Sequence, residues 1–371
     1  MRQCIYILLL LFTVSCDKTL LGDEDQIIGL EENLKSPPAM DDGWGVSTLA
    51  DQNINTESIQ NLIKSIQKDP RNIHSLLIFR NNKLVSESYF YGWNRDRLHA
   101  SRSVSKSFIS TLMGIAIDKG HISNVNQKVF DYFPEYAELN NAQKDLIEIK
   151  HLLTMTTGLQ WDEKSFPSED LRNDETAIEK SSDRLGYIFG KEVASSPGDQ
   201  FEYNSGCPVL EAAIIQKSTG EDAEIFAQKN FFTPLNITNY YWRKNADGLI
   251  TAVGPILLRP RDMAKLGQLF LDGGKWKGKQ IVSANWVTDA TATFIGNEIN
   301  ATGYGYHWWT AKYAINNNVV RMFQAQGSGG QYIFVLPGLN SVVVFTGGNY
   351  PPLNQGTPYG MMTNVIIPAM L

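Results

Sequence analysis

The chain has 371 residues, of which 43% are hydrophobic, and its 33 lysines and arginines against 39 aspartates and glutamates give a net charge of −6. This composition is typical of a globular protein with a large core, and the length suits two lobes or one large enzyme domain. A mildly acidic chain supplies no basic stripe for a phosphate backbone, so we expect no nucleic-acid partner.

The first sixteen residues carry an export signal rather than part of the fold. Arg2 precedes an apolar run at residues 5–12, which is shorter than the roughly 20 residues that span a bilayer. Ser15 and Cys16 follow, a pairing that resembles the bacterial lipobox. An ordinary secretory signal cut nearby is the alternative. We predict a signal peptide at 1–15 and an exported protein of the bacterial cell envelope, anchored to the membrane through a lipid on Cys16.

Residues 16–45 contain clusters of acids and a pair of prolines. We expect them to form a polar tether between the lipid and a folded domain at 46–371. Once the signal peptide is removed, Cys207 is the one thiol inside the mature chain. An exported protein with a single interior thiol forms no internal disulfide, so we expect its core to stabilise it.

The folded domain begins with the pattern of a helix followed by a hairpin. Over residues 59–66 the apolar side chains recur at i, i+3, i+4 and i+7, which is one face of a helix against a core. Two β-rich runs follow at 74–80 and 83–91. Asn81 and Asn82 join them and favour a two-residue turn, because asparagine tolerates a positive φ.

The middle of the chain is mostly helical, and its end returns to strands. Apolar helices are predicted at residues 107–119, 207–219 and 260–271. A second hairpin is predicted from the runs at 331–336 and 341–346. Hairpins at both ends with helices between them indicate an α+β fold, in which an antiparallel sheet is built from both chain ends and a mostly helical lobe is inserted.

This pattern also gives the expected division of the domain. We expect the sheet lobe to comprise residues 46–106 and about 240–371, and the helical lobe to comprise about 107–239. Functional sites usually lie in clefts between such lobes.

The sequence lacks complete motifs for a metal site, a nucleotide site and the α/β-hydrolase nucleophile. Its five histidines are scattered without the spacing of a zinc site. Gly273 to Lys279 has the spacing of a phosphate-binding loop, but Gln280 stands where a serine or threonine must hold Mg²⁺. No serine has the flanking glycines of a Gly-x-Ser-x-Gly elbow. We therefore expect no metal and no cofactor.

Ser103 and Lys106 form a Ser-x-x-Lys motif at the head of the apolar helix 107–119. Positions i and i+3 share a helix face, so the Lys106 amine can meet the Ser103 hydroxyl, which also lies at the positive end of the helix dipole. A lysine acts as a base only if its pKa falls far below about 10.4. The alternative for this motif alone is a helix cap at Ser103 with a solvated Lys106.

Two further segments carry residue types that suit the same chemistry. The loop at 197–206 delivers Tyr203 just before an apolar helix, where a phenol beside an ammonium can be held as phenolate or pass a proton. The glycine-rich residues 327–331 lead into a strand, and a backbone without side chains lets a substrate lie against a sheet edge. The structural alternatives are an aromatic core anchor and a tight bend.

In this order, Ser103 with Lys106, then Tyr203, then the glycine-rich strand entry resemble the serine β-lactamase and penicillin-binding-protein superfamily. The resemblance is closest to its class C-related branch of esterases and amide hydrolases, and it extends from about residue 43 to the C-terminus. Stretches typical of that branch stand at residues 99–108, 151–158, 259–262 and 327–331.

The resemblance implies a β-lactamase/transpeptidase-like fold and an acyl-enzyme mechanism. Ser103 would be the acylated nucleophile, and Lys106 and Tyr203 would share the acid and base roles. The backbone N–H groups of Ser103 and of a residue near Gly330 or Gln331 would form the oxyanion hole. The acyl group would then pass to water, and no cofactor would be needed.

The chain departs from the family pattern at two positions. Ser205 stands where the family's Tyr-x-Asn places a substrate-binding amide, and Ser328-Gly329-Gly330 replaces its Lys-Thr-Gly. That lysine supports recognition of the carboxylate in penicillins and D-Ala-D-Ala peptides. We therefore expect no cation at that corner, poor turnover of β-lactams, and a substrate with a neutral or differently placed acid group.

We thus predict a serine hydrolase that acts on a small ester or amide through a Ser103 acyl-enzyme. A D,D-peptidase or weak β-lactamase is the alternative within the same fold. A non-catalytic lipoprotein that binds cell-wall fragments is the alternative outside the enzymes, although it would have no use for an activated nucleophile. The expected substrate-binding residues are Ser205, Ser328, Gly329, Gly330 and Gln331, with Trp161 and His307 in the pocket wall.

Overall fold

The structure is a computed structural model that describes residues 36–69, 72–250, 255–350 and 356–371. The signal peptide predicted at 1–15, the lipidated Cys16 and the first part of the tether lie outside these residues. Within the described ranges, no helix combines the length and the apolar character that crossing a membrane requires.

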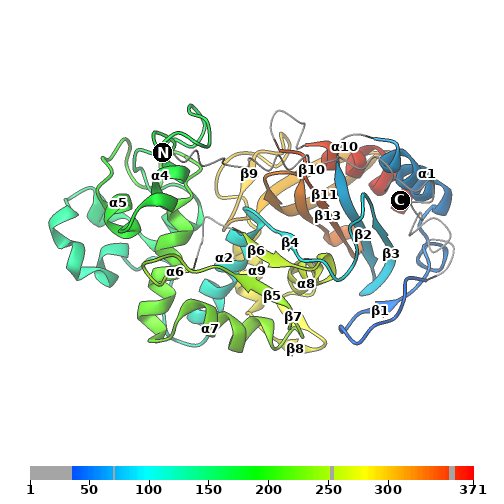
Figure 1. Cartoon of the computed structure of the whole chain (residues 1–371), viewed down its shortest axis with the longest axis horizontal. Coiled ribbons are helices and arrows are strands. Elements are labelled where there is room, and N and C mark those ends of the chain that lie inside the picture. Colours follow the sequence, from blue (N-terminus) through cyan, green and yellow to red (C-terminus); the bar gives the residue numbers. More distant parts are fainter. Residues whose placement is uncertain (1–35, 70–71, 251–254, 351–355) are drawn as a thin grey trace, which may run out of the picture.

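Strands from both ends of the chain form one eight-stranded sheet (Figure 1). Its strands are β1 (Gly45–Val46), β2 (Ile73–Arg80), β3 (Lys83–Tyr89), β9 (Gly303–Tyr304), β10 (Trp309–Ile315), β11 (Asn318–Gly327), β12 (Gln331–Leu336) and β13 (Ser341–Gly347). They lie in the order β1-β3-β2-β13-β12-β11-β10-β9, and only the short pair β1 and β3 is parallel. The predicted α+β fold with a sheet from both chain ends is confirmed.

The turns of the two hairpins are held together at one end of the sheet. Asn81 and Asn82 have φ +51° and +61°, as the first turn requires. Asn340 ends the second turn with φ +47°. The Asn81 backbone N–H donates to the Asn340 carbonyl at 2.9 Å, and the Asn340 side-chain amide donates to Asn81 Oδ1 at 2.8 Å. These bonds join the N-terminal hairpin to the C-terminal hairpin.

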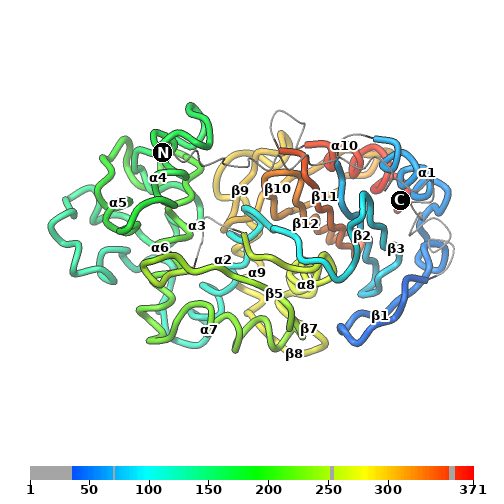
Figure 2. Tube along the Cα trace, in the orientation of Figure 1, coloured from blue at the N-terminus to red at the C-terminus, as the bar shows by residue number. Residues whose placement is uncertain are grey.

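Helices cover both faces of the sheet (Figures 1 and 2). Alternate residues of a strand point to opposite faces. Accordingly, Leu76 and Ile78 pack with the terminal helices, while Leu77 and Phe79 pack in the core shared with the central helices. The terminal helices are α1 (Thr56–Gln67), α10 (Thr357–Met361) and α11 (Ile367–Met370), and the central ones are α2 (Val104–Asp118) and α8 (Pro260–Leu271).

Helix α2 lies between the sheet and a mostly helical part of the chain. It contacts α6 on one side and β11 and β12 on the other. The other helices are α3 (Ile149–Leu153), α4 (Asp174–Lys180), α5 (Arg184–Phe189), α6 (Gly206–Thr219), α7 (Ala223–Ala227) and α9 (Ala284–Ala290). Two small sheets complete the fold: β4 (His99–Ala100), β6 (Ile256–Leu258) and β5 (Tyr240–Trp242) in one, and β7 (Lys275–Trp276) with β8 (Lys279–Gln280) in the other.

The last part of the expected tether is folded onto the domain. The sequence predicts a polar tether up to residue 45, but Asp42 and Trp44 are buried. The Trp44 ring packs on Phe79 with centroids 4.2 Å apart, and its indole N–H donates to the Arg261 carbonyl at 3.1 Å. Asp42, one of the acids that suggested a solvated segment, pairs with the Arg261 guanidinium at 2.9 Å. The folded domain therefore begins before residue 45.

Arg261 holds this segment to the sheet through a buried ion network. Its guanidinium donates to both carboxylate oxygens of Glu87, at 2.8 and 2.5 Å, and the three side chains of Arg261, Glu87 and Asp42 are at most 5% exposed. Removing one partner of a buried pair leaves an uncompensated charge. We therefore expect Arg261→Met to lower the free energy of unfolding by about 3–5 kcal/mol in urea denaturation. The exposed pair of Arg172 with Asp170 supplies the control: Arg172→Met should leave the free energy of unfolding almost unchanged, and equal losses in the two variants would contradict the role of burial.

Candidate active site

Ser103 directly precedes α2 at the junction of the two lobes. Its backbone is close to helical, with φ −64° and ψ −6°, and its side chain caps no backbone N–H of the helix. The hydroxyl is therefore available for chemistry at the helix end where partial positive charge favours an alkoxide. Arg102, the residue before it, has φ +52°, a left-handed conformation that is uncommon outside glycine. Strained backbone of this kind is concentrated at functional sites.

Lys106 lies one helical turn from Ser103, as the motif predicts. The Lys106 Nζ is 3.1 Å from the Ser103 Oγ. The lysine is buried, with 2% of its surface exposed. The alternative in which Lys106 is solvated is therefore wrong.

The pKa of Lys106 is shifted in the direction opposite to the one that a lysine base needs. A lysine base needs a lowered pKa, and burial acts in that direction. Interactions with Tyr203 and Glu163 outweigh burial, however, and raise the pKa of Lys106 above its ordinary value. In the structure the Lys106 amine donates a hydrogen bond to the Ser103 hydroxyl.

Tyr203 lies beside the Lys106 amine. The Lys106 Nζ is 4.9 Å from the centroid of the Tyr203 ring. Met155, which has φ +58°, holds the Tyr203 loop on both sides of the tyrosine. Its carbonyl accepts from the Glu202 backbone N–H at 2.9 Å, and its sulfur accepts from the Asn204 backbone N–H at 3.3 Å. The phenol is thereby fixed next to the ammonium.

The glycine-rich strand entry lies against the nucleophile. Gly329 and Gly330 have φ +85° and +89° and form the turn between β11 and β12. A Cβ on Gly327 would lie 2.5 Å from the Ser101 carbonyl oxygen and 3.0 Å from the Arg102 Cβ. Because only glycine permits this approach, the turn lies directly against the segment that leads into Ser103, and the oxyanion hole expected from its backbone stays a prediction.

The Gln331 side chain does not face a substrate. It is fully buried. Its Nε2 donates to the Gly347 carbonyl at 2.6 Å and to the Ser328 carbonyl at 3.2 Å, and its Oε1 accepts from the Gly347 backbone N–H at 3.1 Å. These bonds fix the side chain in the turn, and the predicted role of Gln331 in substrate binding, through its backbone N–H, stays a prediction. Ser328 is exposed on the same turn.

Glu163, which the sequence did not single out, completes the site. Its Oε1 accepts from the Ser205 backbone N–H and the Trp161 indole N–H, both at 2.5 Å, and its Oε2 accepts from the Ser205 hydroxyl at 3.0 Å. Burial raises the pKa of Glu163, and the charge of Lys106 opposes that rise. Ser205 and Trp161 are buried against this carboxylate. Both side chains bind Glu163, and the prediction that they contact a substrate stays a prediction.

Glu163→Gln is expected to lower kcat about tenfold. The amide keeps the shape of the side chain, but its NH₂ group faces N–H or O–H donors of Ser205 or Trp161, and Lys106 loses a nearby negative charge. Measurement of kcat and KM with p-nitrophenyl butyrate tests this. Glu202→Gln is the control at an exposed residue of the neighbouring loop, where a change within about twofold is expected. Equal losses in the two variants would speak against a specific role of Glu163.

His307 is buried as well, with 2% of its surface exposed. Its Nε2 lies 2.9 Å from Glu211 Oε1, and its Nδ1 lies 3.2 Å from the Tyr304 hydroxyl. The Ser107 hydroxyl donates to its carbonyl at 2.6 Å. These bonds attach the turn before β10 to α2 and α6, and the prediction that His307 contacts a substrate stays a prediction.

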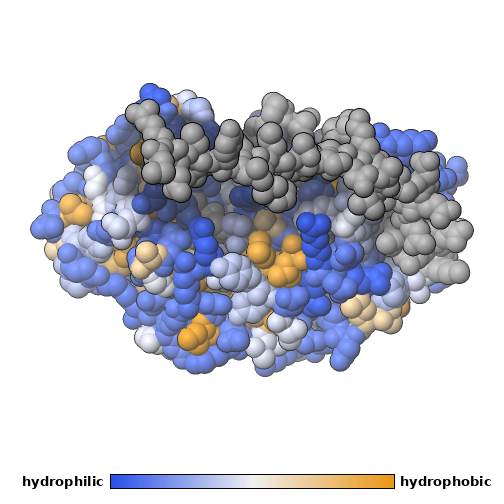
Figure 3. All heavy atoms as spheres, in the orientation of Figure 1, coloured by the Kyte–Doolittle hydropathy of each residue, from blue (hydrophilic) through white to orange (hydrophobic). Residues whose placement is uncertain are grey.

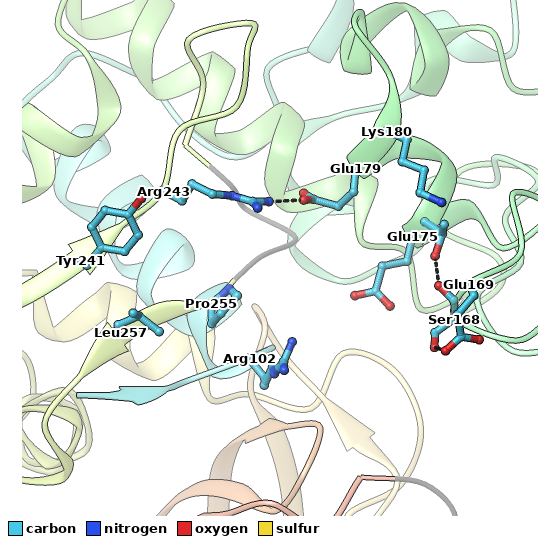
Figure 4. Close-up of a pocket in the computed structure, with 11 residues that line it drawn as sticks. Arg102, Ser168, Glu169, Glu175, Glu179, Lys180, Tyr241, Arg243, Pro255 and Leu257 are labelled. Carbon is cyan, nitrogen blue, oxygen red and sulfur yellow. Dashed lines mark hydrogen bonds and ion pairs between the residues drawn. The ribbon is translucent and has the colours of Figure 1, made fainter. Parts of the chain in front are cut away.

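A cavity of about 620 Å³ opens beside Arg102 (Figure 4). Charged residues of both signs and a smaller apolar side line it. The acids belong to α4 and the loop before it, whereas the apolar residues belong to β5, β6 and the segment that leads into β6. The lining residues are Arg102, Ser168, Glu169, Glu175, Thr176, Glu179, Lys180, Tyr241, Arg243, Pro255 and Leu257.

The surrounding surface is mainly hydrophilic, with apolar residues in small separate patches (Figure 3). Tyr241, at the rim of the cavity, is 54% exposed. Among the residues that the structure describes, no group of three or more His, Cys, Asp or Glu side chains is placed to hold a metal ion.

The structure combines Ser103, the buried Lys106 one helical turn later and Tyr203 beside it with a sheet built from both chain ends. The family model described as Beta-lactamase matches residues 73–357, which is well over half of the chain. The chain therefore belongs to the beta-lactamase family and has the fold of its serine hydrolases.

Hydrolases of amides and of esters are among the similar proteins. The 6-aminohexanoate-dimer hydrolase of Paenarthrobacter ureafaciens is 26% identical over 320 residues, which cover 79% of this chain and 76% of the relative. EstCE1, a hydrolase with promiscuous acyltransferase activity, superposes with a TM-score of 0.68 at 16% identity over 84% of this chain and 98% of its own. A family VIII carboxylesterase superposes with a TM-score of 0.66 at 16% identity over 85% and 97%. At this identity the two structures show a shared fold.

Proposed function

We propose that the chain is a serine hydrolase that cleaves a small ester or amide through an acyl-enzyme on Ser103. The observation that supports this most directly is the 3.1 Å contact between the Lys106 Nζ and the Ser103 Oγ, with the Tyr203 ring beside the same amine. Burying an ammonium costs free energy, and a binding module would gain nothing from burying it against a hydroxyl. This argues against a non-catalytic lipoprotein that binds cell-wall fragments.

In the proposed acylation step, the Ser103 Oγ attacks the carbonyl carbon of the substrate while its proton passes to the Tyr203 oxygen. Lys106 stays protonated and stabilises the phenolate that accepts this proton. Backbone N–H groups of Ser103 and of the turn at Gly330 or Gln331 donate to the carbonyl oxygen as it gains negative charge. The C–O or C–N bond then breaks, and the leaving group takes the proton from Tyr203. A water molecule then attacks the acyl-enzyme through the same series of steps, and the carboxylic acid is released from Ser103.

The substrate in this proposal is an ester or an amide rather than a β-lactam or a D-Ala-D-Ala peptide. No lysine stands in Ser328-Gly329-Gly330, where the family carries Lys-Thr-Gly. The similar proteins include an amide hydrolase and a carboxylesterase. A D,D-peptidase or weak β-lactamase is the alternative, and rapid acylation by a fluorescent penicillin would favour it.

Labelling with a fluorophosphonate, followed by mass mapping, tests the proposal. We expect a single adduct on the peptide that contains Ser103. A panel of p-nitrophenyl esters, amide oligomers and β-lactams then separates the substrate classes, and we expect turnover of esters or amides with little turnover of β-lactams. An adduct on another residue would contradict the proposed nucleophile. Absence of both adduct and turnover would favour the binding lipoprotein.

A further inference from the structure

We propose that Arg102 binds a carboxylate of the substrate, so that the enzyme favours esters or amides with an acid group near the scissile carbonyl. This inference rests on the proposed function and adds the substrate class. Arg102 directly precedes the nucleophile, so its side chain begins next to the reacting bond. Its φ of +52° is unfavourable for a side chain, and such conformations persist where the surrounding structure fixes them.

Tyr350 holds the Arg102 side chain at the glycine-rich turn. The Arg102 Nε donates to the Tyr350 hydroxyl at 2.9 Å, and the guanidinium carbon lies 4.9 Å from the centroid of that ring. Tyr350 in turn stands against Gly329, since a Cβ there would be 2.8 Å from the ring. A cation is thus fixed beside the turn that replaces the family's Lys-Thr-Gly. The expectation of no cation at this corner is wrong, because the charge comes from another part of the chain.

The outer part of the guanidinium is open to a ligand. The Nε supplies one of its five N–H donors to Tyr350. No carboxylate in the described part of the chain forms an ion pair with Arg102. The remaining donors lie in one plane, and their fork matches the two oxygens of a carboxylate. By contrast, Arg243, which lines the same cavity, is paired with Glu179 at 2.5 Å.

The cavity directs an anion towards Arg102. Figure 4 shows Arg102 on the side of the cavity opposite to Glu169, Glu175 and Glu179. These acids lie on the wall formed by α4 and the loop before it, together with Lys180, and Arg243 pairs with Glu179. The three acids outnumber the two cations, so that side of the cavity disfavours a second anion. A substrate carboxylate is therefore placed at the guanidinium, next to the nucleophile. In a partly exposed site, one such charge-assisted pair corresponds to a factor of about 10 in affinity.

A matched pair of esters tests the inference. Mono-p-nitrophenyl glutarate carries a carboxylate, and p-nitrophenyl butyrate does not. We expect the wild-type enzyme to have the higher kcat/KM for the glutarate ester. We expect Arg102→Gln to lower the ratio of the two kcat/KM values about tenfold, mainly through KM. Higher ionic strength should weaken the wild-type preference, because an exposed charge pair is screened by salt.

Arg102→Gly is the second variant, since a φ of +52° suits glycine and the backbone keeps its course. Its selectivity should fall like that of Arg102→Gln. Arg243→Gln is the matched control, because it removes a cation of the same cavity that is already paired, and the ratio should stay within about twofold. An unchanged ratio in both Arg102 variants, or an equal loss for both esters, would overturn the proposal.

A binding measurement separates this inference from the proposed function. If the wild-type chain hydrolysed neither ester, the proposed function would fail, and the carboxylate site would be tested with glutarate itself by titration calorimetry. Binding to the wild type that is about tenfold weaker in Arg102→Gly would support the site. Equal binding to both proteins, or no binding to either, would overturn it.

Discussion

Replacement of Ser103 by alanine is expected to lower kcat for ester hydrolysis roughly 10⁴-fold or more, because loss of the nucleophile leaves only the contribution of binding and the oxyanion hole. The hydroxyl is the group around which Lys106 and Tyr203 are arranged. Its removal should leave the fold intact, since the side chain caps no backbone N–H of α2. The tests are kcat with p-nitrophenyl butyrate and loss of the fluorophosphonate adduct.

Ser105 supplies the matched control for this experiment. It belongs to the same motif and is fully buried. Its Oγ has no hydrogen-bond partner among the described residues, so Ser105→Ala removes no such contact. We expect kcat to stay within about twofold of the wild type. Turnover and labelling that survived in Ser103→Ala would mean that another residue is the nucleophile.

Lys106→Met is expected to lower kcat roughly 10³-fold. Methionine fills a buried lysine site without a charge, so the Ser103 hydroxyl loses its donor and the Tyr203 ring loses the cation beside it. The defect should appear in kcat more than in KM, because the ammonium acts on charge that develops during the reaction. Lys144→Met is the control: this buried lysine donates to the Phe189 carbonyl at 2.6 Å within the helical lobe.

The pH profile separates the two possible roles of Lys106. Nearby negative charge raises the pKa of Lys106 in the fold. Because its pKa is raised in the fold, Lys106 keeps its ammonium at every pH below the ordinary pKa of about 10.4. It loses the proton only when the pH exceeds the pKa in the folded protein. Activity that needs the ammonium should therefore persist to about pH 10 and fall above it. A lysine acting as a neutral base would instead remain active as the ammonium is lost, so activity that rose through about pH 10 without falling would contradict the role of the ammonium.

Patterns within one element made much of the fold and the main site predictable. The spacing of Ser103 and Lys106 on one helix face required only helix geometry, and the structure places their side chains 3.1 Å apart. The turn of Asn81 and Asn82 followed from backbone preference, and the sheet from hairpins at both chain ends. Residues 151–158 were recognised as typical of the family, and the structure shows that Met155 within them holds the Tyr203 loop.

What remained unpredicted depends on contacts between distant segments. Glu163 follows Trp161 by two positions, and nothing in its local sequence shows that its carboxylate reaches Ser205. The raised pKa of Lys106 arises from side chains of three other segments, so its motif alone suggested the opposite direction. The partner of Arg102 stands at Tyr350, near the other end of the chain. Asp42 and the arginines of residues 259–262 are of opposite charge, which could have suggested the pairing of Asp42 with Arg261. The burial of this pair could not have been predicted from their sequence.

The pairing of β2 with β13 has a consequence for the order in which the protein folds. The two strands are neighbours in the sheet, although most of the domain separates them along the chain. The chain is synthesised from the N-terminus onwards, so one edge of β2 has no partner strand until β13 has been made. Pairing between strands so far apart in the sequence is slow. Ser103, Lys106 and Tyr203 are all present long before that point. A chain that stops short of the C-terminal hairpin therefore contains every catalytic side chain and lacks the folded sheet that positions them.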